Sequence, residues 1–209
     1  MLPGAHSSGD QAPNAFLMSA LKILVIPGSL RTGSHNAKLA MAAAHEFAQA
    51  GADVTRISLS DFPLPIYDAD LQGKSGVPKH AVNLKRMIGA HHGVLIVTPE
   101  YNSSVPALVK NTIDWITRVQ DAHERRGQVF RERPFAIAAA SEGRLGGTRA
   151  LAALRLILSA CGATVVPNQL ALSFADQAYD DMDRLKKEAD IEAMKAMVRQ
   201  LIDVSQHMM

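Results

Sequence analysis

The sequence predicts an α/β fold in which one five-stranded parallel sheet lies between two layers of helices. Short, wholly apolar runs recur along the chain, such as VLIV at residues 94–97. Runs of this kind are typical of strands that are buried on both faces. Segments with helical patterns separate these runs, and strand and helix alternate five times. That alternation is typical of a parallel sheet built from crossover units.

The first half of the chain contains three predicted strands. The first ends at Pro27-Gly28, and the helix that follows it ends before Gly51, a residue type that commonly ends helices. A proline- and glycine-containing segment after the second strand reads as a loop. The predicted elements are a strand Leu21–Ile26, a helix Asn36–Ala50, a strand Asp53–Leu59, a loop Asp61–Gly76, a helix Pro78–Ala90 and a strand Val94–Val97.

The second half begins with the clearest helical pattern. Between Ser104 and Val119, apolar residues recur every three or four positions and form one stripe. A charged connector follows, and Trp115 beside the stripe is expected in the core or at a subunit interface. The predicted elements are the helix Ser104–Val119, the connector Asp121–Arg133, a strand Phe135–Ala140, a helix Thr148–Cys161, a strand Ala163–Val166 and a last helix from about Gln177 to Ser205, broken near Asp190.

Composition restricts the function classes. A chain of 209 residues suits one α/β domain, expected at residues 20–209 after a disordered N-terminal extension of residues 1–19. The net charge of +2 is too small to indicate nucleic acid or a membrane surface as a partner. With one cysteine, Cys161, and neither a membrane-length apolar run nor a secretory signal, we expect a cytoplasmic protein. The scattered histidines predict no metal site.

Topology then predicts where a ligand binds. For five parallel strands joined by right-handed crossovers, the flavodoxin-like strand order 2-1-3-4-5 is the natural one. In such a three-layer sandwich, ligands bind beyond the carboxyl ends of the strands, at the switch point between strands 1 and 3. The functional loops should therefore be those that follow Ile26, Val97 and Ala140.

The first of these loops, PGSLRTGSHN at residues 27–36, predicts an anion site. Its small residues allow backbone N–H groups to turn inward, and the next helix presents its positive end there. Phosphate is the expected anion, with Arg31 as a charged donor. The loop has neither the Gly-Lys-Ser/Thr of a triphosphate loop nor the Gly-x-Gly-x-x-Gly of a dinucleotide loop. The alternative is a plain turn in which Ser34 or Asn36 caps the helix.

The other two loops could frame a flat heterocycle. The second, TPEYNSSVP at residues 98–106, has Tyr101 at its tip. The third, SEGRLGGTR at residues 141–149, has three glycines, which indicate positive φ or a close backbone approach. The alternatives are that Tyr101 is a surface anchor, that Ser104 and Thr148 only cap helices, and that Glu100 is a solvated charge.

Three segments carry a resemblance to a known family. GSLRTGSHN, TPEYNSSVPALVKNTIDW and SEGRLGGTRALAALR, in this order and spacing, resemble the NADPH-dependent FMN reductase family, which includes flavin, quinone, azo-dye and chromate reductases. The resemblance covers about residues 22–167. The chain departs from many members by having Ser103-Ser104 after Tyr-Asn and Ala107 after Pro106. This departure concerns contacts near the flavin ring rather than the fold.

The resemblance implies FMN as cofactor, with NADPH or NADH as reductant and a small-molecule electron acceptor such as a quinone or free flavin. The flavin itself would supply the chemistry, so that no catalytic side chain is required and hydride transfer follows a ping-pong order. Three sets of residues are implied around the cofactor: Ser29, Arg31, Ser34 and Asn36 at the phosphate; Pro99, Glu100, Tyr101 and Asn102 beside the isoalloxazine; and Ser141, Gly143, Gly146 and Gly147 approaching the ring from the third loop.

Two other interpretations remain open: a flavodoxin-type electron carrier without a substrate of its own, and a flavin-binding regulatory module. The positive net charge and Arg31 argue against the carrier, because flavodoxins are usually acidic and lack an arginine in the phosphate loop. We also expect a homodimer or homotetramer. The resemblance suggests it, and the wide apolar stripe of residues 104–119 and the long basic connector give independent reasons.

Overall fold

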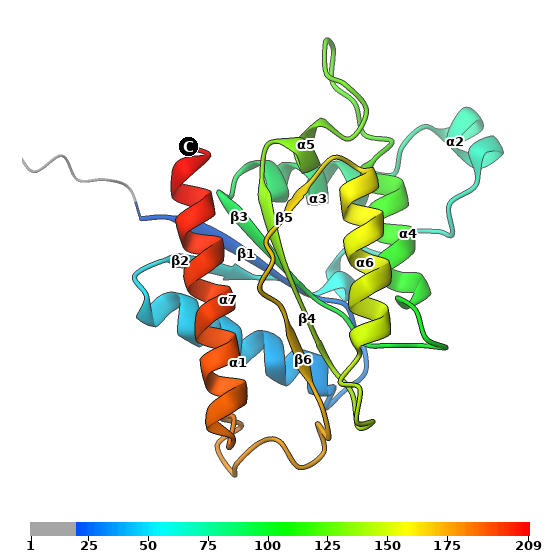
Figure 1. Cartoon of the computed structure of the whole chain (residues 1–209). Helices are drawn as coiled ribbons and strands as arrows, with labels where there is room; N and C mark the ends of the chain where they lie inside the picture. Colours follow the sequence, from blue (N-terminus) through cyan, green and yellow to red (C-terminus); the bar gives the residue numbers. More distant parts are fainter. Residues whose placement is uncertain (1–19) are drawn as a thin grey trace, which may run out of the picture.

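The computed structural model describes residues 20–209, so the predicted N-terminal extension lies outside the described residues. A single parallel sheet has the strand order β2-β1-β3-β4-β5 and lies between two layers of helices (Figure 1). The α/β three-layer fold and its strand order are therefore as predicted.

Alternation of side chains along the central strands creates the two cores. The strands are β1 (Lys22–Pro27), β2 (Asp53–Arg56), β3 (Gly93–Val97) and β4 (Pro134–Ala140). In β1, Ile23 and Val25 face one helix layer, whereas Leu24 and Ile26 face the other. All residues of β3 and β4 are buried, because helices cover both faces of the sheet.

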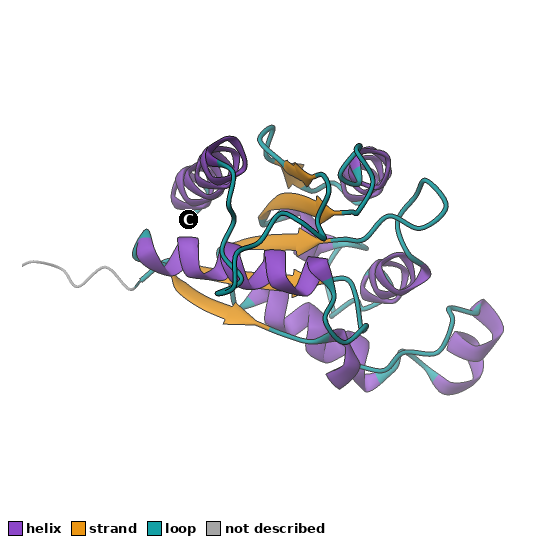
Figure 2. Ribbon diagram, turned by 90° about the horizontal axis from the view of Figure 1, so that it is seen from below, coloured by secondary structure: helices purple, strands orange, loops and turns teal. Residues whose placement is uncertain are grey.

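The two helix layers pack on opposite faces of the sheet, whose strand arrows run in a common direction in Figure 2. Helices α1 (His35–Gln49) and α7 (Glu188–His207) cover one face. Helices α3 (Lys79–Gly89), α4 (Ala107–Ile116) and α6 (Thr148–Ala160) cover the other. Because each crossover helix joins two parallel strands, the loops after the strands meet at one edge.

The fifth strand is divided, which the sequence did not predict. Residues 163–166 contribute only β5 (Thr164–Val165), and a further strand, β6 (Leu170–Leu172), pairs with the carboxyl half of β4. Pro167 between them has no N–H group for the ladder. The Arg155 guanidinium instead donates hydrogen bonds to the carbonyls of Val165 at 3.2 Å and Val166 at 3.0 Å. The predicted strand at residues 163–166 is therefore present in shortened form as β5, and β6 is an additional strand that the sequence did not predict.

The last helix begins later than predicted, at Glu188 rather than near Gln177, and it continues through Asp190 without a break. The Asp180 carboxylate accepts hydrogen bonds from the backbone N–H groups of Met182 and Arg184, both at 2.9 Å. Such a side chain competes with helical hydrogen bonding, so residues 180–184 form a turn. An isolated bridge between Tyr179 and Leu185 closes that turn.

The segment predicted as loop 61–76 contains structure and covers Trp115. A short 3-10 helix, η1 (Leu59–Asp61), precedes it, and α2 (Ala69–Ser75) begins after Asp68, whose carboxylate caps it. Trp115 is fully buried, donates from Nε1 to the Pro65 carbonyl at 2.7 Å and meets the Tyr67 ring edge-on at 5.1 Å. Within this chain Trp115 is therefore a core residue.

The charged connector is also anchored within the chain. The buried Lys85 ammonium donates to Asp121 at 2.6 Å and to Glu124, which ties the connector to α3. Farther along, α5 (Gln128–Arg131) places Val129 and Phe130 in the core. The connector and the apolar stripe thus have internal partners, and they no longer give an independent reason to expect an oligomer.

Candidate functional site

The three loops singled out from the sequence meet at the carboxyl edge of the sheet, at the lower right of Figure 1. They surround a pocket of about 210 Å³. The pocket collects most of the predicted site residues: Ser29, Arg31, Ser34, Asn36, Pro99, Glu100, Tyr101 and Ser141 line it, together with His35, Ala140 and Glu142. The other predicted residues, Asn102, Gly143, Gly146 and Gly147, lie on the same loops but outside its lining.

The first loop has the donors that an anion requires. Ser34 caps α1, because its hydroxyl accepts the Asn36 N–H at 3.2 Å. Within residues 20–209, several neighbouring backbone N–H groups have no hydrogen-bond partner: those of Ser29, Leu30, Thr32, Gly33 and His35. The Arg31 side chain is exposed and forms no ion pair with any described residue. Unpaired amides at a helix start, next to a free guanidinium, suit a phosphate group.

Asn36 lies beneath that loop and joins it to the sheet. Its side-chain amide donates to the Ala140 carbonyl at 2.9 Å, and its carbonyl oxygen accepts the Ala140 N–H at 2.8 Å. Asn36 is 4% exposed, so these two bonds are shielded from water. Asn36 therefore positions the loop, with one side-chain N–H left for a ligand.

The second loop ends in a tight turn that holds Tyr101 out from the sheet. Tyr101 and Ser104 exchange two backbone hydrogen bonds of 3.0 Å, and Asn102 and Ser103 between them have positive φ values of 51° and 64°. Two such residues form the hairpin turn that favours Asn at its first central position. Ser104 belongs to this turn, and Pro106 occupies the N-cap position of α4. The Tyr101 ring is 54% exposed at the pocket rim.

Glu100 acts as the cap of α6. Its carboxylate accepts the backbone N–H groups of Arg149 at 3.1 Å and Ala150 at 3.2 Å, and it pairs with the Arg149 guanidinium. Burial by itself would raise the pKa of Glu100, but these hydrogen bonds and the charge of Arg149 outweigh it and hold the pKa below its usual 4.5. Glu100 is thus an ionised structural group at the pocket wall rather than a solvated charge.

The glycines of the third loop allow close backbone packing. Gly146 and Gly147 both have positive φ, at 59° and 87°. A Cβ on Gly146 would lie 2.5 Å from the Ala171 carbonyl oxygen, and one on Gly147 would lie 2.6 Å from the Ala139 Cβ. The sequence prediction of positive φ and close approach is confirmed at these two positions, although the approach is to strands β6 and β4.

Two further side chains join the loops and were not predicted from the sequence. His35 Nε2 lies 3.3 Å from a carboxylate oxygen of Glu142, which links the first and third loops. The buried His35 Nδ1 has no partner among the described residues. Tyr179 donates its hydroxyl to the His35 carbonyl at 3.0 Å and so attaches the segment before α7 to the first turn of α1. These contacts join residues more than a hundred positions apart, which no local pattern signals.

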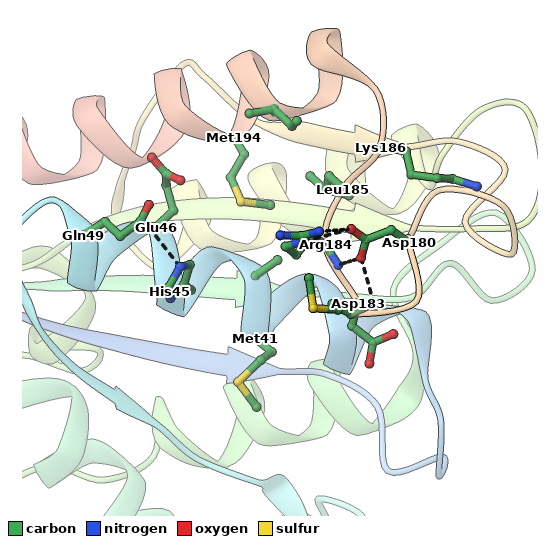
Figure 3. Close-up of a pocket in the computed structure, with 13 residues that line it drawn as sticks. Met41, His45, Glu46, Gln49, Asp180, Asp183, Arg184, Leu185, Lys186 and Met194 are labelled. Carbon is green, nitrogen blue, oxygen red and sulfur yellow. Dashed lines mark hydrogen bonds and ion pairs between the residues drawn. The ribbon is translucent and has the colours of Figure 1, made fainter.

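A second hollow, of about 900 Å³, lies on the outer side of α1 (Figure 3). Met41 and Met194 face it from α1 and α7, and Arg184 lies at its edge, paired with Asp180 at 2.8 Å. It contains none of the predicted site residues. In residues 20–209, no helix is long and apolar enough to cross a bilayer, and no three His, Cys, Asp or Glu side chains are grouped to hold a metal ion.

Comparison with known proteins identifies relatives of this chain by sequence and by structure. A family model described as NADPH-dependent FMN reductase matches residues 21–177. A quinone reductase of Escherichia coli is 40% identical over 139 residues, which are 66% of this chain and 69% of that protein. An NAD(P)H-dependent FMN reductase of Pseudomonas aeruginosa is 32% identical over 182 residues, covering 87% and 93% of the two chains. The solved structure of FerB, a flavoenzyme NAD(P)H:(acceptor) oxidoreductase from Paracoccus denitrificans, has a TM-score of 0.72 at 28% identity and covers 90% of this chain and 98% of its own.

Replacement of Glu100 tests the cap of α6. We expect Glu100→Gln to lower the free energy of unfolding by about 1–2 kcal/mol at pH 7, because charged capping bonds are lost. A carboxylate with a lowered pKa stabilises the fold above its unfolded pKa, and this contribution disappears as the pH falls through the folded pKa. The difference between the variant and the wild type should therefore shrink below about pH 4.5, the usual pKa of this group.

Urea unfolding from pH 3.5 to 7 measures this difference. Glu142→Gln is the matched control, because its side chain is 69% exposed and should change stability little. An equal, pH-independent loss in both variants would contradict the assignment of Glu100 as the cap.

Proposed function

The chain belongs to the NADPH-dependent FMN reductase family, and from this premise we propose how its carboxyl-edge loops serve the reaction. The protein is an oxidoreductase with FMN as cofactor and NAD(P)H as reductant. The observation that carries the site assignment is the set of unpaired amides in the first loop, beside Arg31 and over the start of α1. This donor set fits the phosphate of FMN.

We assign the phosphate to the first loop as follows. Ser29, Arg31 and the backbone N–H groups of residues 32, 33 and 35 bind its oxygens, while Ser34 and Asn36 hold the loop in the required shape. The buried, unpartnered Nδ1 of His35 is a further donor on this side when it carries the proton. Because the loop is already fixed by hydrogen bonds to the rest of the chain, little order has to be imposed on binding.

The flavin ring is assigned to the space between the second and third loops. Pro99 and Tyr101 would face the ring from one side, with Asn102 at the turn, and Ser141 with Gly143, Gly146 and Gly147 would approach it from the other. Unpaired backbone N–H groups of the third loop among residues 20–209, such as those of Glu142 and Gly147, are available to its polar edge. Glu100 supports this wall by fixing the start of α6.

When bound, FMN supplies the redox chemistry by taking hydride from the nicotinamide and returning electrons to an oxidant. The chain's residues bind and orient the reactants and exclude water, and no side chain in the pocket is needed as an acid or base. Relatives named quinone reductase and 2-hydroxy-1,4-benzoquinone reductase support a quinone-type small molecule as acceptor. Of the arginines near these loops, Arg144 is exposed on the third loop and is the candidate contact for the NADPH phosphate.

The family resemblance also suggests that the protein forms an oligomer. We propose a homodimer or homotetramer in which a neighbouring chain meets the exposed rim of the pocket. Large apolar side chains exposed on separate carboxyl-edge loops, Leu30, Tyr101, Leu145 and Phe174, support this rim as a contact surface. Light scattering at micromolar concentration measures it, and the mass of one chain in a fully active sample would contradict it.

Steady-state kinetics distinguishes the reductase from an electron carrier. We expect purified protein loaded with FMN to oxidise NADPH when a benzoquinone is supplied, and to give parallel double-reciprocal lines at varied quinone. The reason is that both reactants use the same open pocket and must therefore take turns. Failure of NADPH to bleach the bound flavin would favour a carrier, and intersecting lines would contradict the ping-pong order.

Removal of the Arg31 side chain tests the phosphate assignment. We expect Arg31→Ala to weaken FMN binding by about 1.5–3 kcal/mol, or roughly 10- to 150-fold, which is the usual worth of a charged hydrogen bond. Riboflavin, which has no phosphate, should bind wild type and variant equally, and more weakly than FMN binds wild type.

Fluorescence titration of apoprotein with either flavin gives these constants. Arg199→Ala removes an exposed arginine from α7 and serves as the control for net charge. Equal FMN affinity in the Arg31 and Arg199 variants would show that the phosphate does not lie in the first loop.

A further inference from the structure

A third pocket, of about 500 Å³, lies where the carboxyl ends of α4 and α6 meet α5. Figure 1 shows these helix ends in its upper right part. Arg118 reaches it from the end of α4, Arg126 and Arg131 from the connector and α5, and Cys161 from the end of α6. We name it the arginine pocket after these residues.

The arginine pocket contains more positive charges than the carboxylates of residues 20–209 neutralise. Its Lys110 ammonium donates to both carboxylate oxygens of Asp114 at 2.8 Å. Within residues 20–209, the guanidinium groups of Arg118, Arg126 and Arg131 have no carboxylate within 4.0 Å and donate no hydrogen bond. Since the whole chain has a net charge of only +2, this is a local concentration of charge. Like charges gathered in a hollow favour binding of an anion.

Two of these guanidinium groups are held in place by packing rather than by counter-ions. The Arg118 guanidinium carbon lies 4.5 Å from the centre of the Tyr67 ring, and its buried Nε has no partner among the described residues. The Arg131 guanidinium lies against the backbone of Gly162, where an added Cβ would be 2.5 Å from Nη1. Donors that are already oriented lose little freedom when an anion binds.

The arginine pocket is separate from the FMN site. Helix α6 has 13 residues, and Thr148 at its start follows the third loop, whereas Ile157 and Cys161 at its end line the arginine pocket. A helix of that length spans about 20 Å. Arg118, Arg126 and Arg131 therefore line a pocket at the opposite end of α6 from the carboxyl-edge loops, and none of them lines the pocket that those loops form.

We propose that the arginine pocket is a binding site for a small anion with one or two phosphoryl groups. A phosphoryl group offers several oxygens in a tetrahedral arrangement, so it accepts from guanidinium groups that arrive from three chain segments at once. A carboxylate offers two oxygens in one plane. Ile113 and Ile157 add an apolar wall beside the charges, on which the rest of a phosphate ester can pack.

Cys161 provides an internal reporter. Its thiol is half-buried at the pocket wall, and burial, together with Asp114, raises its pKa. Since the thiolate is the nucleophile, we expect alkylation to be slow in the free protein. A phosphoryl anion bound beside it covers the sulfur and disfavours the thiolate further, so alkylation should become slower still.

Calorimetric titration of FMN-loaded protein with inorganic pyrophosphate, at ionic strength held constant with sodium chloride, tests the proposal. In that sample FMN occupies the first loop, so pyrophosphate cannot bind there. If the first loop does not bind FMN, the Arg31→Ala variant removes its charged donor instead, and pyrophosphate binding at the arginine pocket can be measured in that variant. We expect saturable binding of one pyrophosphate per chain, together with slower alkylation of Cys161 by iodoacetamide. Arg126→Gln replaces an exposed side chain and leaves the packing intact. This variant should bind pyrophosphate about tenfold or more weakly than wild type, as should Arg131→Gln.

Arg56→Gln is the matched control, because Arg56 is an exposed arginine on β2 outside the pocket. An equal loss in the Arg56 and Arg126 variants would overturn the proposal in favour of general charge attraction, as would the absence of saturable binding. Citrate binding as tightly as pyrophosphate would overturn the assignment to phosphoryl groups.

Discussion

Two hydrogen bonds between the Asn36 side chain and the backbone of Ala140 join the first turn of α1 to the end of β4. Loss of these two bonds would remove a partner from the buried N–H and C=O groups of Ala140, and a buried polar group without a partner lowers the stability of the fold. The first loop, to which we assign the phosphate, ends at Asn36, and the glycine-rich third loop follows Ala140. Asn36 therefore helps to fix the distance between the first and third loops, to which we assign the cofactor, together with the contact between His35 and Glu142.

Other contacts at the same edge follow this pattern, in which one loop satisfies the polar groups of another. Glu100 of the second loop caps α6, which begins after the third loop, and Tyr179 attaches the segment before α7 to α1. Five backbone N–H groups of the first loop differ, because residues 20–209 supply no acceptors for those of Ser29, Leu30, Thr32, Gly33 and His35. A fixed frame around unsatisfied donors is what a preorganised anion site requires. Since the chain belongs to the NADPH-dependent FMN reductase family, we propose the phosphate of FMN as that anion.

The sequence predicts what periodicity and loop chemistry determine. Apolar runs locate the central strands, and small residues after Ile26 and Ala140 locate the loops at their ends. It does not predict what depends on long-range partners. From the sequence, Asn36 is predicted to contact the phosphate, whereas in the structure its side-chain amide binds the backbone of Ala140. Glu100 could be a solvated charge from the sequence alone, whereas in the structure its carboxylate accepts hydrogen bonds from the start of α6. The interruption between β5 and β6 likewise involves a partner on another element, because the Arg155 guanidinium of α6 donates hydrogen bonds to the carbonyls of Val165 and Val166.

We propose that Asn36 holds the loops of the cofactor site together, and FMN titration of Asn36→Ala apoprotein tests this most directly. Loss of hydrogen bonds to buried backbone groups should lower the free energy of unfolding by about 1–3 kcal/mol. FMN affinity should fall as well, because the phosphate loop is no longer held against β4. Asn168→Ala, which removes a side-chain bond to the Ala196 carbonyl away from the site, should leave FMN affinity unchanged. Wild-type FMN affinity in a destabilised Asn36 variant would contradict the account.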